Sequence, residues 1–332
     1  MIDRHSRTGE YAHPHPPPHP RLPASQQDAP RASRFSLASV WERHQRSLAP
    51  WLFLAPALIA FTIYVVVPIV QSLALSLYDW DGLGKASFIG FANYVELFHD
   101  PDFWAALRNN LIWLVGFMLA IPAGLFMALF LNQHVFGIRL IKSLFFFPFV
   151  ISQAVIGLVF SWFYDPTNGL LAHLLHGLGL HGIAVLSDGR YATYGIVIAG
   201  LYPQIAYCMI LYLTGLNNVR ADLIEAARLE GAKGWSMLTR VVLPQLRSAT
   251  FIAVVVTVVG ALRSFDMISI MTQGGPYGSS RVLAYYMYEQ ALSEYGFRMG
   301  YGSAIAAVLF LIMLVYIVFV LVRIYRQEKE HV

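Results

Sequence analysis

The chain has 332 residues, of which 57% are hydrophobic and only 13% are charged, whereas soluble domains carry about 25% charged residues. This composition excludes an ordinary soluble domain and indicates a membrane protein, so the net charge of +4 reflects membrane topology and does not indicate a nucleic-acid partner. The single cysteine, Cys208, excludes an internal disulfide and a cysteine metal cluster, and it is predicted to be a small buried residue in an apolar run.

Residues 1–46 are polar and rich in Pro, His, Arg and Ser. Such a segment buries too little apolar area to order itself, so we expect a disordered tail. It is also too long and too poor in apolar residues for a signal peptide. Metal binding by His13, His15 and His19 is an alternative, but the intervening prolines hold these side chains apart.

Six apolar runs follow, and each is long enough for the roughly 20 residues that cross a bilayer. They are residues 51–77, 111–131, 144–163, 191–213, 249–271 and 303–322. Residues 166–187 are also uncharged but rich in glycine, and we expect a short amphipathic helix near residues 170–175 outside the membrane. The predicted fold class is therefore an all-α membrane protein with six transmembrane helices.

With six spans, both termini lie on the same side of the membrane. Most Lys and Arg residues lie in the two termini, near Arg139 and in the loop around Glu225. The positive-inside rule predicts that these segments are cytoplasmic. The opposite loop, residues 78–104, carries five carboxylates and one lysine. The predicted organisation begins with a disordered cytoplasmic tail at residues 1–46. A transmembrane domain follows at residues 47–325 and contains a long cytoplasmic loop at 217–246. A short cytoplasmic tail ends the chain at residues 326–332.

Two charges, Arg263 and Asp266, lie inside the fifth predicted span. Charges inside a membrane are costly and are usually paired or functional. The i, i+3 spacing allows an ion pair on one helix face, and a gate or a solute contact is the alternative. The rise of 1.5 Å per residue puts both residues about 25 Å from the cytoplasmic end of the helix, near the outer surface.

The loop of residues 217–246 begins with the signals of a helix. Asp222 and Glu225 have the D-x-x-E spacing of a capping box, which predicts a helix start near Asp222. One face of this helix is small and apolar enough to enter a groove on a partner, and it consists of Leu223, Ala226, Ala227 and Glu230.

The same loop continues with a turn and a second helix. Gly231 and Gly234 can adopt positive φ angles and let the chain turn. A second helix is predicted over residues 235–242, and Pro244 is expected to end it.

The chain contains no sequence signature of an enzyme. It has no G-x-x-x-x-G-K-[ST] phosphate loop, and it has no paired-carboxylate, Ser/His/Asp or H-E-x-x-H arrangement at a useful spacing. We therefore predict no catalytic residues, no metal site and no ATP site of this kind.

The loop closely resembles a known family motif. Glu225-Ala226-Ala227, Gly231 and, after nine further residues, Val241-Val242-Leu243-Pro244 resemble the EAA loop of ABC importer permeases. Glu230 stands where Asp is usual, Val241 where Ile is usual, and Arg220 where many members carry Pro. In that family the loop docks into the ATPase subunit, which implies coupling roles for Glu225, Ala226, Ala227, Glu230, Gly231, Leu243 and Pro244.

The likeness extends over about residues 50–325 and is narrowest with the carbohydrate-importer branch, the maltose-type permease subunit. Its most specific part is the T-x-G-G-P sequence at Thr272–Pro276, which predicts a tight turn after the fifth span. Further matching segments are Phe53-Leu-Ala-Pro56, Phe88-Ile-Gly-Phe-Ala-Asn-Tyr94, Phe103-Trp-Ala-Ala-Leu-Arg-Asn-Asn110, Phe265-Asp266, Ala284-Tyr-Tyr-Met-Tyr288 and Gly300-Tyr-Gly-Ser-Ala304.

The resemblance implies a type I ABC importer permease fold in a bacterial or archaeal cytoplasmic (inner) membrane. It implies a paralogous second permease subunit, two copies of an ATPase subunit that bind ATP and Mg²⁺, and an extracytoplasmic solute-binding protein. No cofactor is expected on this chain. Sugars, polyols and glycerol phosphate are the candidate solutes.

The resemblance also implies a solute pathway lined by Phe149, Gln153, Gly200, Gln204, Tyr207, Gly260, Ala261 and Ser264. Sugar sites need hydrogen-bonding side chains and aromatic faces, and several of these residues provide them. Gly200, Gly260 and Ala261 provide neither a hydrogen-bonding side chain nor an aromatic face. Either they make room for a different sugar, or the site lies elsewhere. The i, i+4 spacings predict that Phe149/Gln153, Gly200/Gln204 and Gly260/Ser264 each share a helix face. Interhelical hydrogen bonding is the alternative role for each polar residue.

Two other classes compete with a permease. An ion-coupled secondary transporter needs carboxylates for its coupling ion near the membrane midplane, and no predicted span has one near its centre. A membrane-bound enzyme needs a catalytic cluster, which the sequence lacks.

Overall fold

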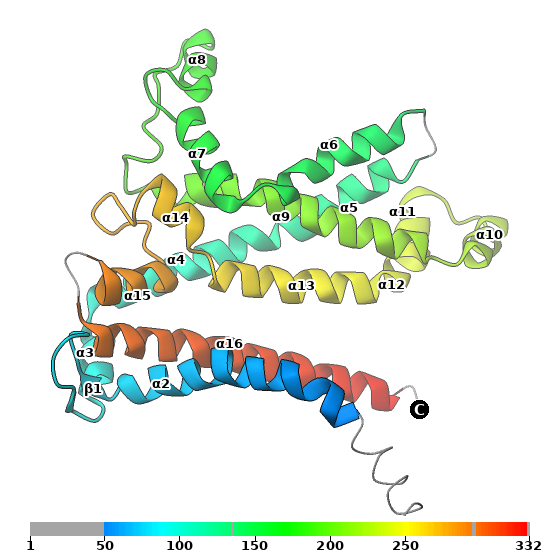
Figure 1. Ribbon diagram of the computed structural model, residues 1–332. Coiled ribbons are helices and arrows are strands. Elements are labelled where there is room, and N and C mark those ends of the chain that lie inside the picture. The colour runs from blue at the N-terminus through cyan, green and yellow to red at the C-terminus, as the bar shows by residue number, and fades with distance from the viewer. Residues whose placement is uncertain (1–49, 134–135, 294–296, 331–332) are drawn as a thin grey trace, which may run out of the picture. The chain divides into compact units, whose positions relative to one another are not determined.

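The computed structural model in Figure 1 describes residues 50–133, 136–293 and 297–330, with side chains as far as Arg326. The chain divides into two units, residues 1–62 and 63–332. In the first unit, residues 50–61 are helical, and large apolar side chains such as Trp51 and Phe53 are exposed. The predicted tail of residues 1–46 lies outside the described residues.

The described part contains five helices that are long and apolar enough to cross a membrane, or six spans if one bent pair counts as a span. The five helices overlap the first, second, fourth, fifth and sixth predicted spans, and they are Pro50–Leu75, Pro101–Leu131, Ala192–Asn217, Arg247–Met271 and Met299–Arg326. The helical class is therefore confirmed. The described exception is a two-stranded hairpin, β1 (Tyr78–Asp79) with β2 (Ser87–Phe88), in which Tyr78 faces Phe88.

The third predicted span is not one straight helix. Helices α6 (Ile138–Val150) and α7 (Gln153–Phe163) meet at an angle of 97°. Pro148 lacks a backbone N–H near the end of α6, and Ser152 is the N-cap of α7, where its Oγ accepts from the Val155 amide at 3.4 Å. Hydropathy does not register this break because both halves are apolar.

The second span begins well before the predicted residue 111. It consists of α4 (Pro101–Met118) and α5 (Ala120–Leu131). Asp100 caps α4, since its Oδ1 accepts from the Asp102 amide at 2.9 Å, and Pro101 occupies the first turn.

Shorter elements join these helices. They are η1 (Thr62–Val66), α2 (Val67–Leu75), α3 (Ala92–His99), α8 (Leu170–Gly177), α10 (Ala221–Leu229), α11 (Gly234–Met237), η2 (Leu238–Val242), α12 (Leu243–Gln245) and α15 (Leu283–Leu292). Helix α8 confirms the predicted short helix near residues 170–175. The longest helix is α16 (Met299–Glu330), and Figure 1 shows α2 running beside it.

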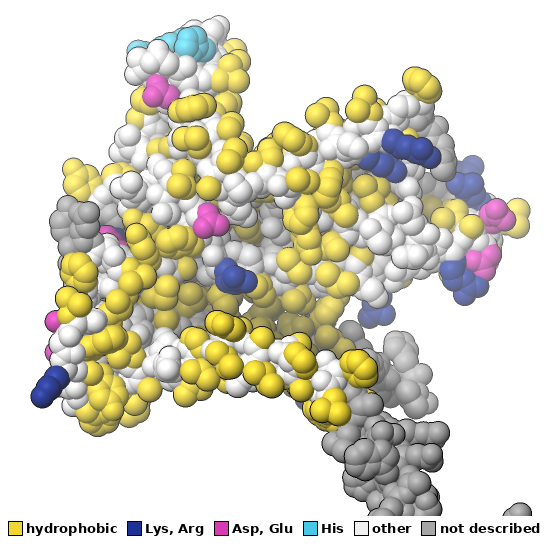
Figure 2. Space-filling model, viewed as in Figure 1, with side chains coloured by type: hydrophobic (Ala, Val, Ile, Leu, Met, Phe, Trp, Pro, Cys, Tyr) yellow, Lys and Arg dark blue, Asp and Glu magenta, His cyan; other side chains and the backbone are white. Residues whose placement is uncertain are grey.

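Helix α9 (Ala192–Asn217) is at the centre of the second unit. It contacts α4, α5, α6, α7 and α13 (Arg247–Leu262). The approach to α5 is very close, because a Cβ added at Gly124 would lie 2.5 Å from Cβ of Cys208. Large apolar side chains cover much of the outside, and Figure 2 shows charged side chains gathered mainly near the helix ends, as expected for a protein surrounded by lipid.

We predict that Gly124→Ala lowers the stability of the protein by about 1–3 kcal/mol, because the added methyl group forces α5 and α9 apart. The matched control is Gly177→Ala, since no atom lies within 4 Å of a Cβ added at Gly177. Thermal unfolding in detergent measures both. Equal stability of the two variants would contradict the close approach of α5 to α9.

Candidate functional site

Helix α10 begins within one residue of its predicted start, but the predicted capping box is wrong. Arg220 is the N-cap residue, and no side chain caps the helix. The Asp222 carboxylate instead pairs with the Arg220 guanidinium, with Nη2 and Oδ2 2.5 Å apart. A charge-assisted bond to a guanidinium is stronger than a bond between neutral groups, so Arg220 competes successfully for this carboxylate. Glu225 is exposed on the helix.

The predicted glycine turn after α10 is confirmed. Gly231 and Gly234 have φ angles of +87° and +50°. The amide of Gly231 donates to the Arg228 carbonyl at 3.1 Å, and the amide of Ala232 donates to the Ala227 carbonyl at 2.9 Å. These two bonds form a Schellman motif, which satisfies carbonyls at the end of the helix and requires a left-handed residue at Gly231.

The second half of the loop is helical over α11, η2 and α12, but Pro244 does not end it. Pro244 lies in the first turn of α12, where a missing N–H does no harm, and the π-helical turn η2 precedes it. The interruption falls at Leu246, which has φ −85° and ψ 7° and separates α12 from α13.

The predicted face of α10 exists, and it lines a hollow within the loop itself. The hollow has a volume of about 350 Å³, and its walls are Leu223, Ala226, Ala227 and Glu230 from α10 and Arg240, Val241, Pro244 and Gln245 from the second half of the loop. Two large apolar residues lie at the turn and were not predicted as functional. Leu229 is 90% exposed and Trp235 is 76% exposed. The signal for both was available in the sequence, since each is a large apolar residue beside a turn in a charged loop.

The Gln245 side chain closes the loop. Its Oε1 accepts from the Arg220 amide at 3.0 Å, and its Nε2 donates to the Val241 carbonyl at 2.9 Å. Residues far apart in the loop are therefore tied at one point, directly before α13.

The residues predicted to line a solute pathway separate into several groups. Phe149 and Gln153 do not share a helix face, because the bend between α6 and α7 falls between them. Phe149 instead packs against Tyr207 of α9, with ring centroids 5.1 Å apart. Gln153 is the first residue of α7 and is exposed.

Gln204 and Gly260 lie together between α9 and α13. The Gln204 Nε2 donates to Oγ1 of Thr257 at 2.9 Å, and a Cβ added at Gly260 would lie 3.9 Å from Gln204 Oε1. Thr257 is fully buried, was not predicted, and gives no signal in the sequence beyond one hydroxyl in an apolar run. Ser264 lies beyond the end of α13, so it does not share a helix face with Gly260; its Oγ donates to the Gly260 carbonyl at 3.1 Å.

Gly200 and Ala261 are packing residues. A Cβ added at Gly200 would lie 3.0 Å from ring atoms of Trp113 and Phe117, so this position allows α4 to approach α9. Gly200 therefore faces those rings, although it lies one turn from Gln204. Ala261 is fully buried beside the same aromatic cluster. Neither residue lines an open surface of this chain, and their role in a solute pathway stays a prediction.

The predicted ion pair between Arg263 and Asp266 is wrong. Arg263 ends α13 as its C-cap, and Asp266 begins α14 (Asp266–Met271) after two non-helical residues. The i, i+3 geometry of a continuous helix is therefore lost, and both side chains are exposed, with no ion pair between them. The alternative role as a gate or a solute contact stays a prediction.

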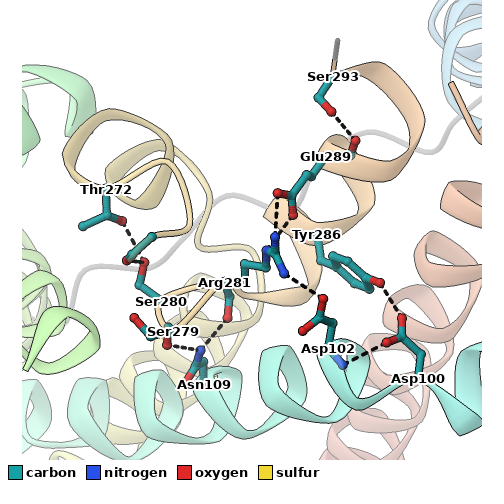
Figure 3. A network of polar contacts seen from close by, with 11 residues as sticks. Asp100, Asp102, Asn109, Thr272, Ser279, Ser280, Arg281, Tyr286, Glu289 and Ser293 are labelled. Carbon is teal, nitrogen blue, oxygen red and sulfur yellow. Dashed lines mark hydrogen bonds and ion pairs between the residues drawn. The ribbon is translucent and has the colours of Figure 1, made fainter. Parts of the chain in front are cut away.

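A polar network joins segments that are far apart in the sequence, as Figure 3 shows. Arg281 forms ion pairs with Asp102, with Nη1 and Oδ2 2.9 Å apart, and with Glu289, with Nε and Oε2 2.7 Å apart. Asn109 donates from Nδ2 to the carbonyls of Ser279 and Arg281, each at 2.7 Å. Two carboxylates of the acidic segment 78–104 thus bind arginines of the last third of the chain, since Glu96 also pairs with Arg298.

The T-x-G-G-P segment lies in this network and forms the predicted tight turn. Gly274 has a φ angle of +77°, and the Gly275 amide donates to the Thr272 carbonyl at 2.9 Å. The hydroxyls of Thr272 and Ser280 are 2.8 Å apart, and Ser280 also donates to the Gly275 carbonyl at 2.7 Å. Figure 3 shows the Thr272–Ser280 contact beside Asn109.

Asp100, near Asp102 in the same network, is a carboxylate that binds two tyrosine hydroxyls. Its carboxylate accepts from the hydroxyls of Tyr286 and Tyr301. Partial burial by itself raises the pKa of Asp100, but the hydrogen bonds from Tyr286 and Tyr301 and from backbone amides outweigh it, so the pKa lies below its ordinary value.

The family model of the binding-protein-dependent transport system inner membrane component matches residues 120–330. The chain is 36% identical over 283 residues to a probable ABC transporter permease of Pyrococcus horikoshii, which covers 84% of this chain and 96% of that protein. It is 32% identical to the lactose transport system permease LacF of Rhizobium radiobacter over 72% of this chain and 81% of that protein.

The fold is similar to that of one chain in a crystal structure of a bacterial alginate ABC transporter in complex with an alginate pentasaccharide-bound periplasmic protein. The TM-score is 0.75 at 22% sequence identity, with 85% of this chain and 95% of that chain covered.

We predict that Gln245→Leu speeds hydrogen exchange of the Arg220 amide about fivefold to tenfold, because the loss of a hydrogen bond worth about 1 kcal/mol frees the start of the loop. Gln133→Leu, at an exposed position outside the loop, is the matched control. Exchange measured by mass spectrometry tests this, and an unchanged Arg220 amide contradicts the role of Gln245.

We also predict that Asp100→Asn destabilises the protein by about 1 kcal/mol at pH 7. This value is small for the loss of hydrogen bonds to a charged group, because the carboxylate is partly exposed to solvent. A carboxyl group with a lowered pKa stabilises the fold above its unfolded-state pKa, and this contribution is lost as the pH falls through the folded-state pKa. The difference between wild type and variant should therefore shrink below about pH 4. Unfolding in detergent as a function of pH measures it, and a constant difference at all pH values argues against a charged Asp100.

Proposed function

The chain belongs to the family of inner membrane components of binding-protein-dependent transport systems, and on that premise we propose that it is a permease subunit of an ATP-driven importer for a sugar or a related solute. Its relatives are permease proteins of ABC transporters. In this proposal the chain forms half of the translocation pathway and hydrolyses no ATP itself.

The proposed topology has six spans, with α6 and α7 together as the third. Both termini and the loop of residues 217–246 are then cytoplasmic. The concentration of Lys and Arg in these segments supports this orientation. The proposed transmembrane domain is residues 47–325, flanked by cytoplasmic tails at 1–46 and 326–332.

We assign coupling to the loop of residues 217–246. The geometry of the loop supports this assignment. Helix α10 ends at the Schellman turn of Gly231, and Gln245, directly before α13, holds its N-cap residue Arg220. Leu229 at the end of α10 and Trp235 after the turn are both exposed. The exposed Glu225 offers a carboxylate to a basic residue of an ATPase. Closure of two ATPase subunits with ATP and Mg²⁺ then moves α10 and shifts the permease between inward-facing and outward-facing states.

The proposed partners are a paralogous second permease subunit, two ATPase subunits and an extracytoplasmic solute-binding protein. The sugar assignment is supported by the lactose permease among the relatives and by the fold of the alginate transporter. On this chain the proposed solute contacts are Phe149, Gln153, Gln204, Tyr207 and Gly260, because these residues combine aromatic faces, amides and an open backbone position outside the packed core.

Purification of the tagged full-length chain from its native membranes tests the assembly. We expect a second permease and an ABC ATPase to be recovered with it, and uptake to stop when ATP is depleted while the ion gradient persists. Uptake that instead follows the ion gradient would favour a secondary transporter. Ligand binding to the cognate solute-binding protein identifies the solute.

We predict that Glu225→Lys and Gly231→Asp each abolish recovery of the ATPase and solute uptake, while the chain still inserts in the membrane. The first reverses a charge on the exposed face of α10, and the second strains a backbone position at φ +87°. Asp79→Lys, the same charge reversal in the β1 strand, is the control and should retain both activities. Wild-type uptake by both loop variants would refute the coupling assignment.

A further inference from the structure

We propose that a groove between helices α13 and α16 is a binding site for an anionic glycerophospholipid. The groove has a volume of about 730 Å³ and lies between the first half of α13 and the second half of α16. Figure 2 shows hydrophobic side chains in the hollow between these helices, whose positions are labelled in Figure 1. This site goes beyond the proposed transport function and does not depend on it.

The charged end of the groove carries two arginines. Arg247, at the start of α13, and Arg323, near the end of α16, both line it and are both exposed. The structure gives neither guanidinium an ion-pair partner among the described residues, and no carboxylate is among the described residues that line the groove. Two unpaired guanidinium groups at one end of a groove attract an anion, and a guanidinium binds phosphate with two parallel hydrogen bonds.

The walls below the arginines are apolar. Phe251 and Val255 come from α13, and Phe319 and Val320 come from α16. At 1.5 Å per residue, Val255 lies about 12 Å along α13 from Arg247. A cationic rim above apolar walls of this depth matches a ligand with a phosphate at one end and acyl chains below it.

The two arginines decide which occupant fits the groove. An apolar helix of a second permease subunit seated there would leave both guanidinium groups uncompensated. The charge at this end of the groove therefore favours the lipid.

Lipid titration of the purified full-length chain, followed by native mass spectrometry, tests the site. The probes are phosphatidylglycerol and phosphatidylcholine with identical acyl chains. We expect wild type to bind the first phosphatidylglycerol about tenfold more tightly than phosphatidylcholine, in keeping with charge-assisted contacts from two arginines. In Arg247→Gln with Arg323→Gln this preference should fall to twofold or less.

Two further variants separate the groove from general surface charge and from misfolding. Arg139→Gln with Arg228→Gln removes two exposed arginines that do not line the groove, and it should keep the preference. Val255→Trp fills the groove while both arginines stay, and it should also lose the preference. Retention of the preference in the Arg247 and Arg323 variant, or its equal loss in the Arg139 and Arg228 variant, overturns the proposal.

A photo-cross-linking amino acid in place of Val255 distinguishes the lipid from a protein in native membranes. An adduct with phospholipid supports the site. An adduct with a membrane protein instead means that a neighbouring subunit fills the groove, and it overturns the proposal.

Discussion

The backbone of α9 lies so close to its neighbours that side chains do not fit between them. A Cβ added at Gly116 would lie 2.4 Å from Cγ1 of Val197, and one added at Gly124 would lie 2.8 Å from the Met209 amide nitrogen. Association of helices in lipid has little hydrophobic driving force and depends on close packing and hydrogen bonds. The positions of α4, α5, α7 and α13 therefore depend on contact with this one helix.

Polar side chains then fix which segments meet in the apolar body. Asn110 accepts from the Leu283 amide at 2.8 Å through its Oδ1, and it belongs to the same helix as Asn109, which holds the carbonyls of Ser279 and Arg281. A buried amide that loses such a partner is costly in a medium without water. The Asp100 cap sets the start of α4 at Pro101, and these bonds satisfy the polar side chains in the turns that the predicted span left out.

Hydropathy, charge and glycine positions predicted the helical class, five of the spans and the turn at Gly231, because each of these depends on local composition or on one residue's allowed φ angle. The helix breaks at Ser152 and after Leu262 were missed because the segments on either side together form one apolar run, and the charges Arg263 and Asp266 were placed on a continuous helix. The partner of Asp222 was missed because the D-x-x-E spacing does not show that Arg220 competes for the carboxylate. The pairing of Asp102 with Arg281 spans 179 residues, and no sequence spacing identifies such a partner.

The burial of Gly200 and Ala261 illustrates a further limit, because a sequence position does not show which side chains of other helices pack against it. At Gly200 the rings of Trp113 and Phe117 occupy the space that a side chain would need. Among the residues implied by the resemblance, Gln204 lies beside Gly260, and Phe149 packs against Tyr207. Thr257, which accepts the hydrogen bond from Gln204, was not predicted, because the sequence does not show that α13 packs against α9 at this level.

Helix α13 connects the loop to this cluster. Its amino-terminal end follows Gln245, which holds the loop, and its Thr250 and Thr257 accept hydrogen bonds from Tyr212 and Gln204 of α9. The helix is uninterrupted from Arg247 to Leu262, so a displacement at the loop is carried over the roughly 15 Å to Thr257 without a hinge. The break after Leu262 ends this rigid path. We therefore expect movement of the loop to act first on the contact between Gln204 and Thr257, and to reach α14 and the T-x-G-G-P turn through neighbouring helices, by the packing of α14 against α7 and α9 and by the bonds from Asn109 of α4.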